Sequence, residues 1–255
     1  MITIFTGKSI FSYLVLRRVM KEKNKFFVCI SNTSTSSISN LRKIFQSTSF
    51  SYFIYRGLIQ VFSLLPIFSI EKYLKKKFVN YEIISNRNDL LALDLKSEFG
   101  ISLNFDCIIP EDVINKFPKG IINLHASNLP ADKGISPVVW AYCRGDKNII
   151  CSYYLINEKL DDGEILDKKS IIINNNWSLF KTYCEILINA SEHFVELIKS
   201  YQNGNKLVLQ NHTKDIKASY NSWPDKKLHK LMKFHKRKYF VVGDIFYILG
   251  KFSQE

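Results

Sequence analysis

Short apolar runs of strand length alternate with helically periodic stretches over the first half of the chain. Ser9 precedes the first of these predicted helices as a candidate N-cap, and a second helix is predicted over Asn88–Phe99. Strands and helices in alternation predict an α/β fold with a doubly wound, mostly parallel sheet. The runs that we predict to be its strands are Ile2–Gly7, Phe26–Ser31, Asn80–Ser85, Asp106–Pro110 and Gly120–His125.

The pattern changes in the second half. Residues 148–157 and 164–173 read as a long strand pair around a turn at Asp161–Gly163, and an amphipathic helix is predicted over Trp177–Tyr201. From about Ser219 onwards the chain is a basic tail that ends in an apolar segment. We therefore predict a core domain over residues 1–203, with an apolar insert at about 50–77, and a small basic C-terminal appendage over 204–255.

The apolar stretch Gly57–Ile70 lies within that insert. It is shorter than the roughly 20 residues that span a bilayer, and Pro66 interrupts it, so we expect no transmembrane segment. Arg56 precedes the stretch and three lysines follow it at 75–77, which suits weak association with a membrane surface. A buried helical hairpin and a homodimer face are the alternatives, and all three stay open.

Composition places the chain among ordinary globular proteins. Of its 255 residues 46% are apolar and 23% are charged, which disfavours disorder, collagen, coiled coils and disulfide scaffolds. The 36 basic and 23 acidic residues give a net charge of +13, a field that attracts nucleotides, nucleic acid or acidic lipids. A compositional bias toward Ile, Asn, Lys and Phe would produce the same charge without any function.

The five cysteines include no CxxC pair, so neither a disulfide ladder nor a zinc site is expected. The histidines also show no metal-ligand spacing with a second His, Cys or carboxylate, and we predict no bound metal. The N-terminus runs directly into a predicted strand rather than a signal peptide. Together these features predict a cytoplasmic protein.

The chemistry-bearing residues follow the last predicted parallel strand. Asn123 and His125 are two positions apart, so one face of a strand presents both. A loop with Pro130 and Gly134 comes next, and an acidic turn at Asp161 follows the next strand. An amide that donates to an oxyanion, an imidazole that moves protons and a carboxylate that orients it suit acyl transfer.

This stretch resembles the folate-dependent formyltransferases, a family that includes glycinamide ribonucleotide, methionyl-tRNA and sugar-nucleotide N-formyltransferases. Asp161 lies 38 positions after Asn123, as the family spacing requires, and the strong match covers about Asp106–Ile173. The residues that match the family pattern are Asn123, His125, Ser127, Leu129, Pro130 and Gly134, followed by Leu160, Asp161 and Gly163.

The resemblance implies a Rossmann-like formyltransferase core with Asn123, His125 and Asp161 as the catalytic residues. The donor would be 10-formyltetrahydrofolate, whose formyl carbon an acceptor amine attacks. Asn123 and a protonated His125 would stabilise the tetrahedral oxyanion. Asp161 would hold His125, or a water that relays the amine proton to the folate nitrogen.

Contacts to the two substrates follow from the same resemblance. Two departures from the family pattern stand in the loop: Ala126 replaces the usual Pro, and Lys133 replaces a frequent Arg. Lys133 keeps the positive charge but lacks the planar fork of Arg. The expected cofactor-binding residues are Leu103, Asn104, Phe105, Asp106, Ile156 and Leu160. The expected substrate-binding residues are Ser127, Lys133, Tyr220 and Trp223.

The acceptor is the least determined feature. Eighty-two residues follow Ile173, fewer than a methionyl-tRNA enzyme needs for its extra domain. The insert and the aromatic tail favour a surface-polysaccharide enzyme that formylates the primary amine of a nucleotide-linked amino sugar, with no nucleic-acid partner. Formylation of methionyl-tRNA or of a purine precursor, a non-enzymatic nucleic-acid-binding protein, and a catalytically silent membrane-surface protein remain as alternatives.

Overall fold

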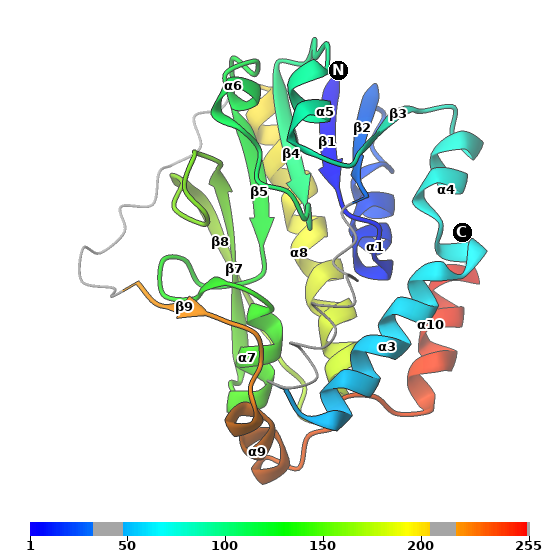
Figure 1. The fold of residues 1–255 in the computed structure, drawn as a ribbon, viewed down its shortest axis with the longest axis vertical. Helices are drawn as coiled ribbons and strands as arrows, with labels where there is room; N and C mark the ends of the chain where they lie inside the picture. Colours follow the sequence, from blue (N-terminus) through cyan, green and yellow to red (C-terminus); the bar gives the residue numbers. More distant parts are fainter. Residues whose placement is uncertain (33–47, 205–217, 254–255) are drawn as a thin grey trace.

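A seven-stranded sheet forms the centre of the molecule (Figure 1). The computed structural model describes residues 1–32, 48–204 and 218–253. The strands in spatial order are β3 (Asn80–Ile84), β2 (Phe26–Ser31), β1 (Ile2–Thr6), β4 (Phe99–Leu103), β5 (Ile121–His125), β7 (Asn148–Leu155) and β8 (Ile165–Ile172). The first five pair in parallel, and β7 and β8 are antiparallel additions. The predicted α/β fold with a mostly parallel sheet is confirmed.

One predicted strand was wrong. The segment Asp106–Pro110 is a loop, and the strand between β1 and β5 is instead β4, whose five residues are all buried. The predicted helix over Asn88–Phe99 is correspondingly shorter, since α5 covers Arg87–Ala92. Gly100 weakens the apolar pattern of β4, yet a Cβ there would lie 3.2 Å from side chains of Ile121 and Phe117. The close packing around this central strand requires a glycine at position 100, and that glycine interrupts the apolar pattern that would identify a buried strand.

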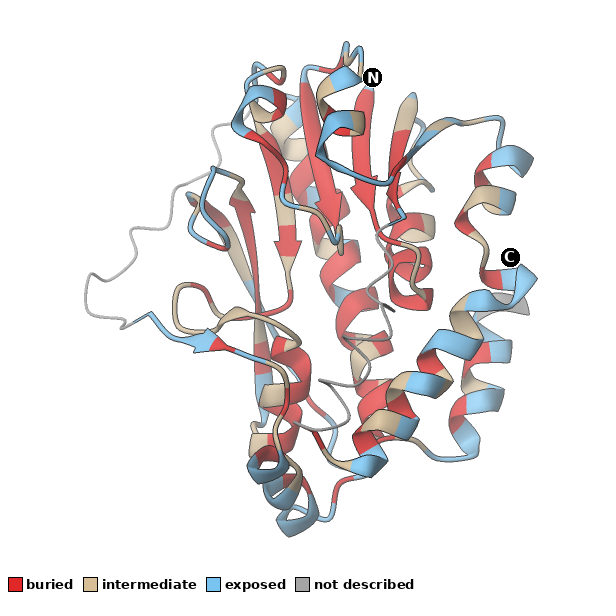
Figure 2. Ribbon diagram, viewed as in Figure 1, coloured by how far each residue is buried: buried red, intermediate tan, exposed pale blue. Residues whose placement is uncertain are grey.

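Helices cover both faces of the sheet (Figure 2). Alternation along β1 sends Ile2 and Ile4 into the larger core with α1 (Ile10–Val19) and α8 (Leu179–Gln202), and Phe5 into a smaller core with α5 and α6 (Glu111–Ile114). Ser9 caps α1 by accepting the backbone N–H of Ser12, as predicted. Helix α7 (Pro137–Arg144) follows the loop after β5.

The insert forms α3 (Phe50–Leu64), the short helix η1 (Pro66–Phe68) and α4 (Ile70–Lys76). One side of α3 is buried through Tyr52, Tyr55 and Ile59, whereas the opposite side is exposed. The insert is thus neither a fully buried hairpin nor a free arm. No helix within the described ranges has the length and apolar character to cross a bilayer.

The tail packs on the core at both of its described ends. Its first strand, β9 (Tyr220–Asn221), pairs with β6 (Lys133–Gly134) of the loop after β5. Further on, the carbonyls of Lys238 and Tyr239 accept the first backbone N–H groups of α8, which a helix leaves unpaired. Two helices complete the tail, α9 (Lys226–Phe234) and α10 (Gly243–Ser253).

Arg237 anchors the tail to α7. It is 7% exposed, its guanidinium stacks on the Tyr142 ring at 4.7 Å, and it donates to the carbonyls of Tyr142 and Asp146 and to Oδ1 of Asn175. A buried cation with three acceptors is costly to remove because the acceptors stay buried without a donor.

We expect Arg237→Met to lower the free energy of unfolding by about 3 kcal/mol, since buried acceptors lose their donor. Denaturant unfolding followed by circular dichroism measures this. The control is Lys238→Met, an exposed neighbour, for which a change within about 0.5 kcal/mol is expected. Equal effects of the two substitutions would contradict the anchoring role.

Candidate active site

Two polar side chains stand on one face of β5 near its carboxyl end. The antiparallel register with β7 sets Asn123 opposite Tyr154. Nδ2 of Asn123 donates to the Tyr154 hydroxyl at 3.1 Å, and that hydroxyl donates to Oδ1 of Asp161 at 3.0 Å. A continuous hydrogen-bond chain therefore links the β5 amide to the acidic turn, through a tyrosine that the sequence motif did not single out.

The Asp161 carboxylate is fixed toward His125. Asp161 is 6% exposed and has a φ of 51°, a left-handed conformation that persists in a non-glycine residue where its surroundings hold it. Its Oδ2 accepts the Gly134 backbone N–H at 2.9 Å and lies 3.6 Å from Nε2 of His125. The structure thus brings Asn123, His125 and Asp161 together around Tyr154.

Two glycines allow this convergence. A Cβ at Gly163 would lie 1.6 Å from the Leu155 carbonyl oxygen, so any side chain would push the acidic turn off β7. Gly134 has a φ of 99°, and a Cβ there would lie 2.4 Å from the Asn221 carbonyl oxygen of the tail. Both motif glycines are therefore required by close backbone approach.

Burial controls the charge of His125. Its side chain is 15% exposed, and its Nε2 is buried with no hydrogen-bond partner among the described residues. Desolvation lowers the pKa of His125 below its ordinary value, and the Asp161 carboxylate opposes this only in part. The structure therefore favours a neutral imidazole at pH 7, whereas the resemblance implied a protonated one.

The adjacent carboxylate points elsewhere. Asp162 forms an ion pair with Lys133, which lowers the pKa of Asp162. Its side chain is 42% exposed, in contrast to buried Asp161. Lys133 is one of the expected substrate-binding residues. In this structure its ammonium group forms an ion pair with the Asp162 carboxylate.

A cavity of about 780 Å³ lies beside the imidazole, at the carboxyl ends of the parallel strands. Parallel sheets bind ligands at this edge, where the strand order reverses between β1 and β4. The insert helix α3 and the tail residue Trp223 supply the facing wall. The strand-end residues that line the cavity are Lys8, Ser9, Ser31, Asn32, Asn104, Phe105, Asp106, Leu124, His125 and Ala126.

The expected cofactor contacts divide into two groups. Asn104, Phe105 and Asp106 line the cavity, and burial raises the pKa of Asp106, which accepts a hydrogen bond from Ser31 at 3.3 Å. The other three side chains lie away from the cavity lining. Leu103 is buried in the core, Ile156 packs against the smaller core, and Leu160 is 56% exposed.

The expected substrate contacts are also dispersed. Trp223 lines the main cavity. Ser127 is buried and lines a different pocket of about 420 Å³, and Tyr220 is 60% exposed beside Gly134.

Sequence reasoning missed the contribution of the insert to the cavity. Arg56 of α3 lines it, with its guanidinium carbon 5.4 Å from the centre of the Trp223 ring. No carboxylate of the described residues forms an ion pair with Arg56. Tyr52 and Tyr55 sit on the same side of α3 with buried hydroxyls. The signal in the sequence was the spacing of polar and aromatic residues at 52, 55, 56 and 60 within a segment that otherwise reads as apolar.

In the described ranges no three His, Cys, Asp or Glu side chains lie close enough together to bind a metal ion. The described chain has all five cysteines as free thiols, and burial raises the pKa of Cys29, Cys143 and Cys151 to about 12.

The amide of Asn123, the imidazole of His125 and the carboxylate of Asp161 meet at the carboxyl edge of a mostly parallel sheet, an arrangement that suits acyl transfer. The chain belongs to the formyl transferase family, whose sequence model matches residues 66–198, just over half of the chain. That match contains all three side chains.

Individual relatives agree with the family. The methionyl-tRNA formyltransferase of Buchnera aphidicola subsp. Schizaphis graminum is 28% identical over 164 residues, which cover 64% of this chain and 46% of the relative. That of Mycoplasma genitalium is 34% identical over 84 residues, covering 33% of this chain and 27% of the relative. The chain thus spans about a quarter to a half of the length of these relatives.

A solved structure shares the fold. It is an N-formyltransferase from Helicobacter canadensis in complex with folinic acid and dTDP-3-aminofucose. It matches with a TM-score of 0.57 and 19% identity over 87% of this chain and 70% of its own.

We expect the pKa of His125 to lie below 6.5, and Asp161→Asn to lower it further, because the carboxylate is the main group that raises it. NMR titration of the imidazole Cε1–H signal measures both values. Asp162→Asn is the matched control and should leave the value unchanged.

The same shift predicts a pH dependence of stability. A lowered folded pKa means that the unfolded chain binds the proton more readily, so stability is lost as pH falls from 6.5 through the folded pKa. His125→Gln should remove this component of the acid sensitivity. A folded pKa of His125 above 6.5 would contradict the burial argument.

Proposed function

We propose that this protein is an N-formyltransferase. It would move the formyl group of 10-formyltetrahydrofolate to the primary amine of a nucleotide-linked amino sugar in surface polysaccharide biosynthesis. The observation that carries the proposal is His125, which lines the cavity and whose buried Nε2 lies 3.6 Å from Oδ2 of Asp161 with no hydrogen-bond partner among the residues that the structure describes.

The residues present suit the donor. Bound 10-formyltetrahydrofolate supplies an electrophilic formyl carbon and a nitrogen leaving group. Nε2 of His125 has no hydrogen-bond partner within the described part of the chain. A substrate oxygen, a substrate amine or a water molecule could form this hydrogen bond. Asn104, Phe105 and Asp106 line the same cavity, at the edge where the resemblance places the pterin.

Each side chain has a distinct role in this proposal. Asn123 uses one amide hydrogen on Tyr154 and keeps the second for a developing oxyanion. The neutral His125 accepts the proton that the attacking amine loses and passes it to the departing folate nitrogen as the bond from that nitrogen to the formyl carbon breaks, and Asp161 stabilises the imidazolium in between. Tyr154 and the Gly134 N–H act as positioning groups because they hold Asp161 in place.

The acceptor assignment is supported by the cavity wall that the insert and the tail provide. Arg56 forms no ion pair with a carboxylate of the described residues, so its guanidinium suits a pyrophosphate, and Trp223 beside it adds an aromatic ring to the cavity wall. The structural neighbour from H. canadensis was crystallised with a nucleotide sugar that carries an amine.

Methionyl-tRNA is the second candidate acceptor, because the curated relatives carry that name. It predicts formylation of charged tRNA, and no mass gain on any amino-sugar nucleotide. Incubation of the protein with 10-formyltetrahydrofolate and each acceptor class, followed by mass spectrometry, distinguishes the two. No formylated product from any acceptor, together with no folate binding, would overturn the proposed function.

We expect Asn123→Ala and His125→Ala each to lower kcat for formyl transfer by about a hundredfold or more, since one oxyanion or proton-transfer group contributes about 3 kcal/mol to the barrier. Initial rates of product formation measure the effect. The chain offers a matched control in His193, whose Nε2 lies 2.7 Å from Oδ2 of Asp167 on another part of the molecule. His193→Ala should stay within a few-fold of the parent rate, and an equal loss in both histidine variants would sink the assignment.

We expect Arg56→Met to raise KM for the nucleotide-linked acceptor about tenfold or more, with a smaller effect on kcat, because a charge-assisted hydrogen bond to phosphate is lost. The KM for the same amino sugar without its nucleotide should not change. Arg17→Met is the control, since Arg17 also stacks on an aromatic ring, that of Tyr13, but does not line the cavity. An unchanged KM for the nucleotide-linked acceptor would exclude Arg56 from recognition.

A further inference from the structure

The outer side of α3 carries an exposed apolar stripe. Phe50, Ile54, Val61 and Leu64 are 67, 47, 58 and 73% exposed, at a spacing that returns to one face of a helix. The opposite side of α3 is buried, so the helix is apolar on both sides. A second apolar face of this kind requires an apolar neighbour that the described chain does not supply.

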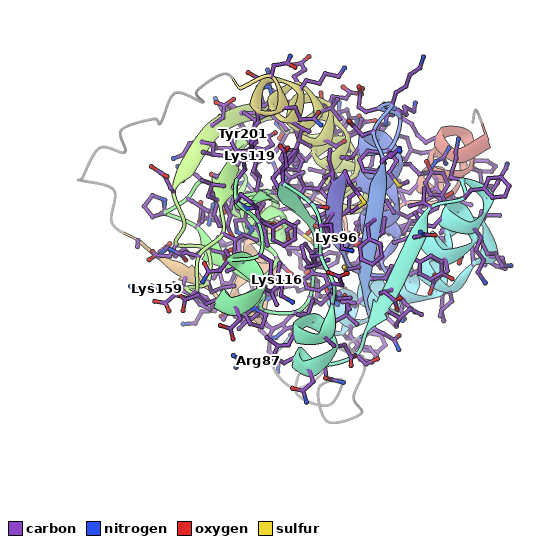
Figure 3. All side chains as sticks on the ribbon, turned by 90° about the horizontal axis from the view of Figure 1, so that it is seen from above. Arg87, Lys96, Lys116, Lys119, Lys159 and Tyr201 are labelled. Atoms are coloured by element: carbon purple, nitrogen blue, oxygen red, sulfur yellow. The ribbon has the colours of Figure 1, made fainter. Side chains whose placement is uncertain are left out.

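The tail helix α10 repeats this arrangement. Val242, just before α10, and Phe246 and Leu249 within it are 73, 72 and 49% exposed, while Asp244 and Ile248 on the other side of the helix are buried. Phe240, just before α10, stacks on Phe62 of α3 with ring centres 5.9 Å apart. Figures 1 and 3 both show α10 beside the helices of the insert, so the two helices that carry these residues lie at one corner of the molecule.

Positive charge borders this corner, and Glu71 of α4 is paired with Lys8. Lys72 and the three lysines at 75–77 of α4 and its end are exposed, and Phe78 directly after them is 96% exposed. Residues 50–70 contain no Asp or Glu. Asp244 is buried and accepts the Val241 N–H at 2.8 Å.

We propose that this corner binds the surface of a membrane that contains anionic lipids. Apolar side chains that project from a helix, beside lysines whose ammonium groups reach phosphate, are the combination that interfacial binding requires. A second copy fits less well, because a two-fold interface would set the same lysines against each other. Leu64 lines both the stripe and the cavity, so bound lipid would lie next to the cavity mouth.

Vesicle co-sedimentation of the full chain tests this inference independently of any enzymatic activity. The probe is phosphatidylcholine vesicles with or without phosphatidylserine. We expect binding to the anionic vesicles that weakens as salt is raised, and much weaker binding to phosphatidylcholine alone. No sedimentation with anionic vesicles would overturn the proposal.

Two sets of surface substitutions locate the contact. Reversing the three α4 lysines (Lys75→Glu, Lys76→Glu, Lys77→Glu) should weaken binding by about a hundredfold or more, because each lysine near an anionic surface contributes about fivefold. The matched control reverses three exposed lysines elsewhere (Lys96→Glu, Lys159→Glu, Lys169→Glu), two of which Figure 3 labels away from α10. If the control weakens binding as much, the attraction is a property of net charge and the proposal fails.

The apolar stripe is tested by Val242→Ser with Phe246→Ser, for which at least a tenfold loss of vesicle binding is expected. Ile108→Ser with Ile172→Ser removes two equally exposed apolar residues elsewhere and should have no effect. All substituted side chains are exposed, and circular dichroism verifies that each variant is folded. If instead the parent dimerises in solution and the Val242/Phe246 pair abolishes the dimer but not lipid binding, the corner is a protein interface and the proposal is wrong.

Discussion

The candidate site depends on where the Asp161 carboxylate is held. One oxygen accepts from the Tyr154 hydroxyl and the other from the Gly134 N–H, so neither can rotate away from His125 without losing a buried hydrogen bond. Both donors are themselves fixed by strand pairing, Tyr154 by the β5–β7 register and Gly134 by its pairing with β9. The position of the carboxylate is therefore determined by the sheet and by the tail, and the left-handed turn follows from it.

In the proposed function, chemistry and recognition would be divided between the family core and the segments outside its match. Residues 66–198 contain the amide, the imidazole and the carboxylate. Arg56 and Trp223 lie outside that range, yet both line the cavity and contact each other. A fold that keeps its reacting groups on strand ends can change its substrate by changing the walls around them.

The sequence predicted the features that follow from local pattern. Apolar runs located β1, β2, β3 and β5, and the spacing of Asn123 and His125 put both on one strand face. It failed at β4, because Gly100 and Ser102 break the apolar run and only pairing with β1 and β5 makes this segment a strand. The sequence also did not predict that Arg56 lines the cavity. The position of Arg56 depends on how α3 packs over the strand ends, a long-range arrangement that local periodicity does not determine.

The large positive charge lies mostly outside the chemistry. In the cavity Lys8 pairs with Glu71 at 2.7 Å, and at the acidic turn Lys133 pairs with Asp162, so these ammonium groups are neutralised. Arg56 is the cavity-lining cation with no ion pair among the described residues. Burial, rather than net charge, thus sets the protonation of His125, since desolvation outweighs the attraction of Asp161. In the proposed membrane contact, the excess lysines would act at the surface, where solvent screens their charge from the buried His125.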